Sequence, residues 1–330
     1  MREIIEHAAA EISLDLTPDG RRVVNVAPAD PATLVPRNGC TTSYPRDLIE
    51  TILRVSGPAA LCDEISRDED PGYMALSIRN VLFAHAPPSD PAGGRILDFG
   101  CGCGASTVVL GRTLPGSPIL GLDIEERRLA VARARARHWG LRDVSFGVAP
   151  GEGLPSDIGS FGRVMLSAVY EHLLPRTRKA LLPELWSVVE PGGCLYICET
   201  PYRWFPADAH TTLLPLINYL PDDLALLFAR RFSPLVSRGQ DWEGLLRMGV
   251  RGATAGEIMG ILRSAGEGEP RLLRPDRGRG RTWTDLWFAG PTLHSYPGGR
   301  RVVKLLSSSL ERAVGLPFVP FISLAVQKIR

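Results

Sequence analysis

Apolar residues in the middle third of the chain form short continuous runs separated by helix-length segments. The expected strands are 95–99, 119–122, 144–148, 164–167 and 194–198. Their apolar residues are continuous rather than alternating, as in strands buried on both faces. Strands of this kind that alternate with helices predict a parallel sheet joined by crossover helices. The clearest helix runs from about Glu125 to Trp139, with its entry at Asp123 or Ile124 and its stop at Gly140.

This regular alternation breaks after Glu199. Residues 201–251 resemble an insertion of loops with one helix over Asp222 to Arg231, and insertions at the carboxyl edge of a sheet often form lids. Core-like pattern returns with a helix at Ala255 to Ser264, a weak strand at Arg271 to Leu273 and a last strand at Phe321 to Gln327. These elements complete a sheet of seven strands.

The first 90 residues carry Pro and Gly punctuation and helical runs at Asp47 to Val55 and Ala75 to Ala84. We therefore expect an α/β fold, a Rossmann-like, mostly parallel seven-stranded sheet flanked by helices, with a helical N-terminal cap and a lid insertion. The expected division is a cap over 1–90, a cofactor-binding core over 91–200, a lid over 201–252 and a C-terminal completion of the core over 253–330.

Composition narrows the class of protein. Of 330 residues, 44% are apolar and 22% charged, which is typical of a globular protein. The 38 basic and 36 acidic side chains give a net charge of +2, so the total charge does not favour nucleic acid as a partner. The six cysteines lack the CxxC spacing of zinc sites, which indicates free thiols. Because no apolar run reaches the ~18 residues of a membrane span, and acids stand where a signal peptide needs an apolar core, we expect a cytoplasmic protein without integral membrane contact.

The most informative segment is the first strand of the core and the turn after it. An apolar strand from Arg95 to Phe99 runs into three glycines at alternate positions, Gly100, Gly102 and Gly104, and then into a helix. Glycine allows the positive φ of a tight turn and a close approach of the backbone to a ligand. The helix amides that follow can receive a carboxylate.

Two cofactor classes fit this turn. Gly100-x-Gly102-x-x-Ala105 also satisfies the relaxed dinucleotide fingerprint, which would make the chain a nicotinamide oxidoreductase. S-adenosylmethionine is favoured because Asp98 lies where its carboxylate can pair with the methionine ammonium, and because the third glycine is Gly104. Asp123, at the end of the next strand, can accept the ribose hydroxyl hydrogens of either cofactor.

Together with Ser167 to Leu173 and Pro191-Gly192-Gly193, these segments resemble the class I S-adenosylmethionine-dependent methyltransferases over residues 94–200. The resemblance implies S-adenosylmethionine as cofactor, with residues 98–104 on its methionine portion and Asp123 on its ribose. It also implies cofactor contacts at Ile124, Glu152 and Ser167.

The chain departs from the family pattern at two points. Members often carry an Asp for the adenine amine where this chain has Pro150, so a backbone carbonyl near Ala149 is the alternative partner. The usual Phe-Asp opening of the fourth strand is Phe161-Gly162 here.

Candidate catalytic residues follow the fourth and fifth strands, at the edge where ligands bind. His172 is the first candidate base, because a hydroxyl or ammonium acceptor must lose a proton and histidine accepts one near neutral pH. Glu-His-Leu also occurs in family members with different substrates, so His172 could instead shape the cofactor pocket. His210 is a candidate second base.

The expected substrate contacts are Tyr170, Tyr202, Arg203 and Trp204. Arg203 could clamp an anionic substrate, and Trp204 or Phe205 could stack on a flat or sugar-like one. The alternative for this segment is a lid with aromatic packing and a cap at Asp208. We expect no metal, because no two histidines have i, i+4 spacing and methyl transfer does not need one, although Glu171, His172, Asp208 and His210 could in principle converge.

The sequence thus predicts methyl transfer to oxygen or nitrogen of a small molecule, such as a sugar-containing molecule or another secondary metabolite. One alternative is a nucleic-acid methyltransferase, prompted by Arg271, Arg274, Arg277, Arg279 and Arg281, although the chain lacks an Asn-Pro-Pro-Tyr motif. Another is a noncatalytic binding protein on the same scaffold. Apolar runs at 213–220 and 315–322 leave room for a lipid-linked substrate, and core burial explains them equally well.

Overall fold

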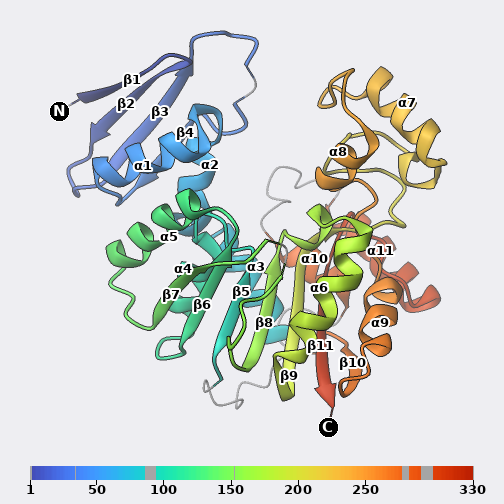
Figure 1. Cartoon of the computed structure of the whole chain (residues 1–330). Helices are drawn as coiled ribbons and strands as arrows, with labels where there is room; N and C mark the ends of the chain where they lie inside the picture. The colour runs from blue at the N-terminus through green and yellow to red at the C-terminus, as the bar shows by residue number, and fades with distance from the viewer. Residues whose placement is uncertain are drawn as a thin grey trace. The chain divides into compact units, whose positions relative to one another are not determined.

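The computed structural model describes residues 2–33, 35–85, 94–151, 153–276, 282–290 and 300–329 (Figure 1). Contacts divide the chain into two units, Met1–Ile78 with Cys101–Val148, and Arg79–Gly100 with Ala149–Arg330. The strands form a four-stranded sheet, in the order β1-β2-β3-β4, and a seven-stranded sheet, in the order β10-β11-β9-β8-β5-β6-β7.

The N-terminal part of the first unit is an antiparallel sheet with two helices packed on it. Its strands are β1 (Arg2–His7), β2 (Ala10–Leu16), β3 (Arg22–Pro28) and β4 (Gly39–Thr42). The helices α1 (Arg46–Ser56) and α2 (Pro58–Glu69) bury their apolar residues in one core with Ile12 and Leu14 of β2.

This sheet corrects the expectation of a purely helical cap over residues 1–90. The predicted helices at 47–55 and 75–84 are present as α1 and α3 (Met74–His85), but residues 2–42 hold strands. In β2, Ile12 and Leu14 are buried while Glu11 is exposed, which is the two-residue period of a sheet with one solvated face. That alternation was present in the sequence and was missed.

The rest of the first unit contributes α4 (Ala105–Thr113), β6 (Ile119–Asp123), α5 (Glu126–His138) and β7 (Val144–Val148). Strands β6 and β7 are parallel, with Ile119 opposite Val144 and Asp123 opposite Val148. Both predicted strands are confirmed. Helix α5 begins one or two residues later than expected, with Glu125 as its N-cap.

A buried ion pair connects α2 to α5. The guanidinium of Arg135, which has no exposed surface, donates to Asp68 at 2.8 Å and to Glu64 at 3.2 Å. The Asp68 carboxylate also accepts hydrogen bonds from the Tyr44 hydroxyl and from the Trp139 indole, the latter at 2.9 Å. A buried charge with several hydrogen-bonded partners fixes one packing of these elements.

The second unit contains the other five strands of the large sheet. They are β5 (Ile96–Phe99), β8 (Phe161–Ser167), β9 (Val189–Pro201), β10 (Glu269–Leu273) and β11 (Phe321–Ile329). Strands β5, β8 and β9 are parallel, and β11 lies antiparallel between β9 and β10. The expected mostly parallel sheet of seven strands is confirmed.

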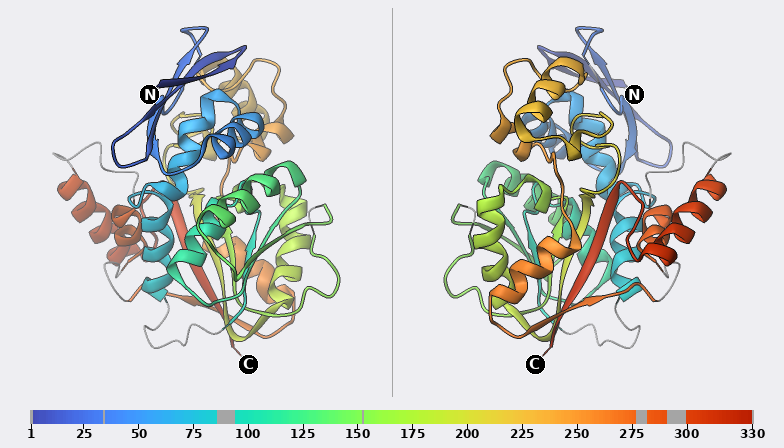
Figure 2. Two further views of the ribbon diagram at one scale, coloured as in Figure 1. Left: turned by 90° about the vertical axis from the view of Figure 1, so that its left-hand side faces the viewer. Right: turned by 90° about the vertical axis from the view of Figure 1, so that its right-hand side faces the viewer.

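Helices cover both faces of these strands. Helices α6 (Pro175–Ser187) and α9 (Ala255–Ser264) lie on one face, and α10 (Trp283–Ala289) and α11 (Arg300–Val314) lie on the other (Figure 2). The short η1 helix (Tyr170–His172) follows β8 directly. It therefore begins at the carboxyl edge of the parallel strands.

The predicted lid has a small core of its own. It includes η2 (Ile217–Tyr219), the predicted helix α7 (Asp222–Phe232) and α8 (Trp242–Arg247) around buried Ile217, Ala229 and Leu245. The buried guanidinium of Arg251 donates to the backbone carbonyls at 217, 218 and 220 and to the Asp222 carboxylate. Arg251 thus connects the end of the lid to η2 and to the start of α7.

Within the described ranges, no helix combines the length and apolar character needed to cross a membrane. All six cysteines are free thiols, as predicted.

Candidate active site

The carboxyl ends of β8 and β9 in the second unit carry strained backbone. Ala168 and Glu199 have φ of 53° and 57°, in the left-handed region that non-glycine residues rarely adopt. The Ala168 N–H donates to the Cys198 carbonyl at 3.0 Å, and the Glu199 N–H donates to Ser323 Oγ at 3.0 Å. Strain of this kind is typical of functional sites.

The first glycine of the motif is required by packing in the second unit. Gly100 has a φ of +74°, and a Cβ on it would lie 2.6 Å from Cγ2 of Val169, in the loop after β8. Asp98, two residues earlier on β5, is almost fully buried. Ser167, the last residue of β8, is half-buried. The loops after β5 and β8 can approach this closely only because residue 100 has no side chain.

The other two glycines position the candidate ribose acid in the first unit. The Gly102 N–H donates to Oδ2 of Asp123 at 2.8 Å, and the Glu125 N–H donates to Oδ1 at 3.0 Å. Gly104 has a φ of +81°, and a Cβ on it would lie 2.7 Å from Cα of Ala132 in α5. The glycine turn thus packs against α5 and orients the Asp123 carboxylate.

The first unit's part of the motif fits an S-adenosylmethionine site. Gly104 caps α4 and offers no side chain to its N-terminus, so this helix end can face a ligand carboxylate. Each Asp123 oxygen has a second lone pair beyond the one its backbone donor uses. Ile124 beside it is 58% exposed and offers an apolar surface. Glu152 lies outside the described residues.

Two histidines and a glutamate converge in the second unit. Glu171, His172 and His210 each offer a ligand atom, and these three atoms lie within 4.8 Å of one another. Oε1 of Glu171 is 3.9 Å from Nε2 of His172. The first two residues come from η1 and the third comes from the lid, so the fold brings together the two predicted bases. From the sequence, Glu171 was named only as one of four residues that could in principle converge on a metal.

Hydrogen bonds assign the tautomer of both imidazoles. Nδ1 of His172 donates to the Arg247 carbonyl at 2.8 Å. The Thr211 hydroxyl donates to the Met248 carbonyl at 2.9 Å, so it accepts from Nδ1 of His210 at 3.1 Å. Each ring therefore carries its lone pair on Nε2, where it can accept a proton.

The third member of the cluster is a buried carboxyl. Oε2 of Glu171 accepts a hydrogen bond from the Thr200 hydroxyl at 3.2 Å. The buried Oε1 of Glu171 has no hydrogen-bond partner within the described chain. Burial raises the pKa of Glu171 to about 7. Burial also lowers the pKa of His172 and of His210, and in His210 the neighbouring His172 lowers it further. Both histidines are therefore neutral at pH 7 and able to act as bases.

Gly249 makes room for this cluster. It has a φ of +105°, and a Cβ on it would lie 2.8 Å from Nδ1 of His210 and 3.4 Å from Cγ of Glu171. Only glycine allows the lid backbone to pass this close to both side chains. The sequence pattern alone does not point to Gly249, because the role of this residue depends on a contact between distant segments.

Asp208 and Glu171 have different roles in this region. Asp208 accepts hydrogen bonds from the N–H groups of residues 210, 211 and 212, so it caps the turn that carries His210 and is not a fourth member of the cluster. The set of Glu171, His172 and His210 has the side-chain types that zinc sites use, and it equally suits proton transfer.

Two of the predicted substrate contacts, Tyr170 and Tyr202, have buried side chains. Tyr170 has no exposed surface, and its hydroxyl donates to Glu257 at 3.2 Å. Tyr202 is 5% exposed. The Arg178 guanidinium donates to Glu257 at 3.1 Å and lies over the Tyr170 ring, 4.6 Å from its centroid. This network connects η1 to α6 and α9.

Arg203 and Trp204 remain candidates for substrate binding. Trp204 is 49% exposed and stacks on Tyr219 with ring centroids 6.3 Å apart. The guanidinium of Arg203 lies 5.8 Å from the centroid of the Trp204 ring. Together they present a cation and an aromatic face on the lid.

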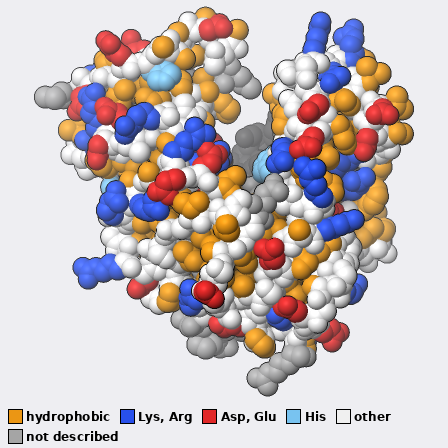
Figure 3. Space-filling view, viewed as in Figure 1, with side chains coloured by type: hydrophobic (Ala, Val, Ile, Leu, Met, Phe, Trp, Pro, Cys, Tyr) orange, Lys and Arg blue, Asp and Glu red, His pale blue; other side chains and the backbone are white. Residues whose placement is uncertain are grey.

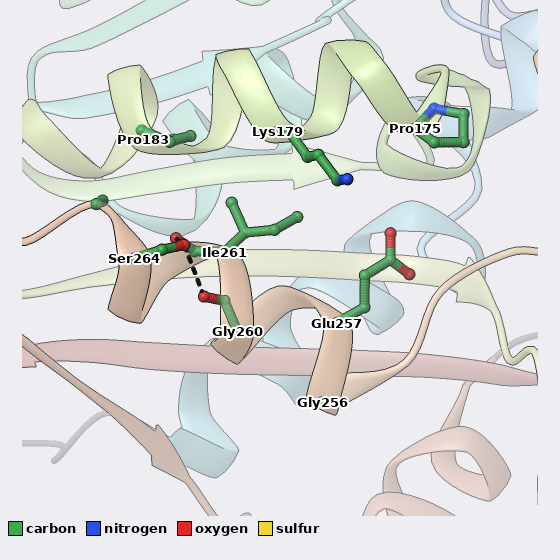
Figure 4. A pocket seen from close by; sticks show the side chains of 9 residues that line it. Pro175, Lys179, Pro183, Gly256, Glu257, Gly260, Ile261 and Ser264 are labelled. Carbon is green, nitrogen blue, oxygen red and sulfur yellow. Dashed lines mark hydrogen bonds between the residues drawn. The ribbon is translucent and has the colours of Figure 1, made fainter.

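A separate pocket of about 540 Å³ lies between α6 and α9 (Figure 4). Lys179, Glu257 and Ile261 line it, and the predicted site residues do not. Glu257 is also the partner of Tyr170 and Arg178. The pocket therefore adjoins the support of η1 rather than the cluster of histidines.

The comparisons with known proteins place this fold and motif in a family. Residues 96–193 match the model of the methyltransferase domain family. Methyltransferase GfsG of Streptomyces halstedii is 34% identical over 124 residues, 37% of this chain and 44% of that protein. A demethylmenaquinone methyltransferase of Clavibacter sepedonicus is 34% identical over 148 residues, 43% of this chain and 57% of that protein.

Among solved structures, a phosphoethanolamine N-methyltransferase of Haemonchus contortus is 14% identical, with a TM-score of 0.45, and the match covers 99% of this chain and 71% of that one. The chain spans about half the length of the curated relatives it matches. A mostly parallel sheet with a glycine turn after β5 and an acid at the end of β6 defines a Rossmann-like α/β domain. The family match identifies residues 96–193 as a methyltransferase domain.

Proposed function

We propose that this protein transfers the methyl group of S-adenosylmethionine to oxygen or nitrogen of a small molecule, with a sugar-containing molecule or another secondary metabolite as the expected class. The clustering of Glu171, His172 and His210 after β8 and in the lid, with the lone pair of each imidazole on Nε2, carries this proposal. It supplies proton acceptors at the edge where ligands of such sheets bind.

The cofactor assignment follows the resemblance. Residues Asp98 to Gly104 hold the methionine portion, Asp123 holds the ribose, and Ile124, Glu152 and Ser167 complete the contacts. The support for this assignment is the orientation of Asp123 by two backbone N–H groups and the N-terminus of α4, which has no side-chain cap. The adenine partner is the backbone near Ala149, since Pro150 offers no side-chain acceptor.

When bound, S-adenosylmethionine supplies an electrophilic methyl carbon on a sulfonium. Nε2 of His172 or of His210 would accept the proton that the acceptor's oxygen or nitrogen loses on methylation. Glu171 then stabilises the imidazolium, because its unpartnered oxygen lies 3.9 Å from Nε2 of His172. Arg203 and Trp204 orient the acceptor from the lid.

A thermal-shift titration tests the cofactor. A ligand at 100 times its dissociation constant stabilises by about 2.7 kcal/mol, so S-adenosylmethionine and S-adenosylhomocysteine should raise the melting temperature and NAD should not. Asp123→Ala should abolish the shift. A shift with NAD alone would make the chain an oxidoreductase, and no shift with any ligand would favour a noncatalytic binding protein. Unchanged affinity in Asp123→Ala would overturn the ribose assignment.

Single and double His172→Asn and His210→Asn variants test the bases. With an acceptor found by screening, the double variant should lose about 100-fold or more in kcat, because general-base catalysis contributes about that much. His7→Asn, on exposed β1, is the matched control and should keep full activity. Dialysis against a chelator should leave the rate unchanged. Full activity of the double variant contradicts the base assignment, and loss of activity on dialysis points to a metal instead.

A further inference from the structure

Helix α11 is amphipathic, and its polar side faces the protein. Ser307, Ser308 and Glu311 are 5–6% exposed, whereas Leu305 and Leu306 are 66% and 65% exposed. A helix of a globular domain normally buries its apolar stripe and exposes its polar one. The orientation of α11 is the reverse.

Specific contacts hold the polar side inward. The Glu311 carboxylate accepts the Trp283 N–H at 3.0 Å and the Thr284 N–H at 2.9 Å, so it satisfies two donors at the start of α10. Lys304 pairs with Asp285 of α10 at 2.9 Å. The inward face is therefore fixed by capping and by an ion pair, and the helix cannot turn its leucines inward without losing these contacts.

The outward face is a continuous apolar surface. Six of its residues are between 42% and 66% exposed, and they are Val302, Val303, Leu305, Leu306, Leu310 and Val314. The surface continues into the following turn with Leu316 and Phe318, which are 53% and 38% exposed. Figure 2 shows α11 in red on the outer side of α10. Single exposed leucines are ordinary, but a contiguous surface of this kind marks an interaction site.

The charge of α11 indicates which kind of partner this apolar surface binds. The helix sequence contains Arg300, Arg301, Lys304 and Arg312, and its one acid, Glu311, is buried against α10. The sequence of this helix therefore carries a net positive charge. Two copies of a helix with this charge repel one another, whereas an anionic lipid surface attracts it.

We propose that α11 binds this protein peripherally to an anionic membrane surface, with its apolar face in the boundary between headgroups and acyl chains. At 15 residues and about 1.5 Å per residue, the helix is too short to span a hydrocarbon core of about 30 Å and lies in the plane of the interface. This inference does not depend on the cofactor or on the acceptor.

Sedimentation with lipid vesicles tests the proposal on the full chain. The protein should partition onto vesicles of equal parts phosphatidylcholine and phosphatidylglycerol, less onto phosphatidylcholine alone, and less as salt rises. The variant Leu305→Glu with Leu306→Glu should reduce binding at least about tenfold, because charges replace the apolar contact. Arg312→Glu, which leaves the apolar face intact, should weaken binding to anionic vesicles only.

The matched control is Leu227→Glu on α7, since Leu227 is 64% exposed and lies outside α11. It should bind vesicles as the unmodified chain does, and melting temperatures of all variants confirm folding. Failure of the unmodified protein to bind either vesicle overturns the proposal. If it also forms a dimer that the α11 variant abolishes, the surface is a contact between two copies instead. Equal loss of binding in Leu227→Glu overturns the assignment to α11.

Discussion

Glu171 shows how one buried side chain defines the candidate site. It follows Tyr170 in the motif after β8, but only the fold places its carboxyl beside the imidazoles of His172 and His210. The sequence predicted both histidines from their positions after two strands. It did not predict that the lone pair of each imidazole lies on Nε2. This tautomer depends on two backbone carbonyls of the lid: that of Arg247 accepts from Nδ1 of His172, and that of Met248 accepts from the Thr211 hydroxyl.

The raised pKa of Glu171 predicts a pH-dependent stability. Between the ordinary pKa of 4.5 and the folded pKa of about 7, the unfolded carboxyl ionises while the folded one keeps its proton. The free energy of unfolding therefore falls as pH rises across this range, by up to about 3 kcal/mol at about 1.4 kcal/mol per pKa unit. Glu171→Gln has no carboxyl to ionise, so its free energy of unfolding should not fall in this way. Urea unfolding should therefore show the variant becoming more stable relative to the unmodified chain as the pH rises from 5 to 8.

The control for this measurement is Glu243→Gln, because Glu243 is half-exposed on α8. Its stability difference from the unmodified chain should be nearly the same at both pH values. A Glu171→Gln difference that is equally flat would contradict a raised pKa at Glu171.

At the scale of elements, strands with short continuous apolar runs were the most predictable. Strands β5, β6, β7, β8 and β9 appear as continuous apolar runs, and the structure confirms each of them. Strands β1 to β4 were missed because one of their faces is solvated and their pattern alternates. Helix α11 was not predicted for a related reason. Its apolar residues face outward, so they are not part of a buried core.

The buried pair of Arg135 and Asp68 joins helices from different parts of the first unit. Arg135→Met should cost about 3–5 kcal/mol in urea unfolding, because it leaves the Asp68 carboxylate buried without its cation. Adding Asp68→Asn should recover part of that loss. Arg133→Met on the same helix is the control, because this exposed pair with Glu126 should contribute at most about 1 kcal/mol. Equal losses for Arg133 and Arg135 would show that burial of the pair does not matter.

For the whole molecule, charge bears on the nucleic-acid alternative. The net charge is +2, and acidic and basic side chains are interspersed on the face shown in Figure 3. Arg271, from the arginine-rich segment, donates to Gln327 at 2.5 Å, while Arg277, Arg279 and Arg281 lie outside the described residues. We expect no retardation of labelled RNA or DNA in gels at physiological ionic strength. Retardation that weakens with salt would revive this alternative.

The sequence by itself determined the parallel sheet, the glycine turn and the acid at the end of β6, because strand burial and positive φ impose local patterns. It also determined which segments supply the two histidines. Only the tertiary structure decided that Glu171 and Gly249 join them, that Tyr170 and Tyr202 are buried, and that α11 faces outward. These properties depend on contacts between residues far apart in the chain, which leave no periodic signal in the sequence.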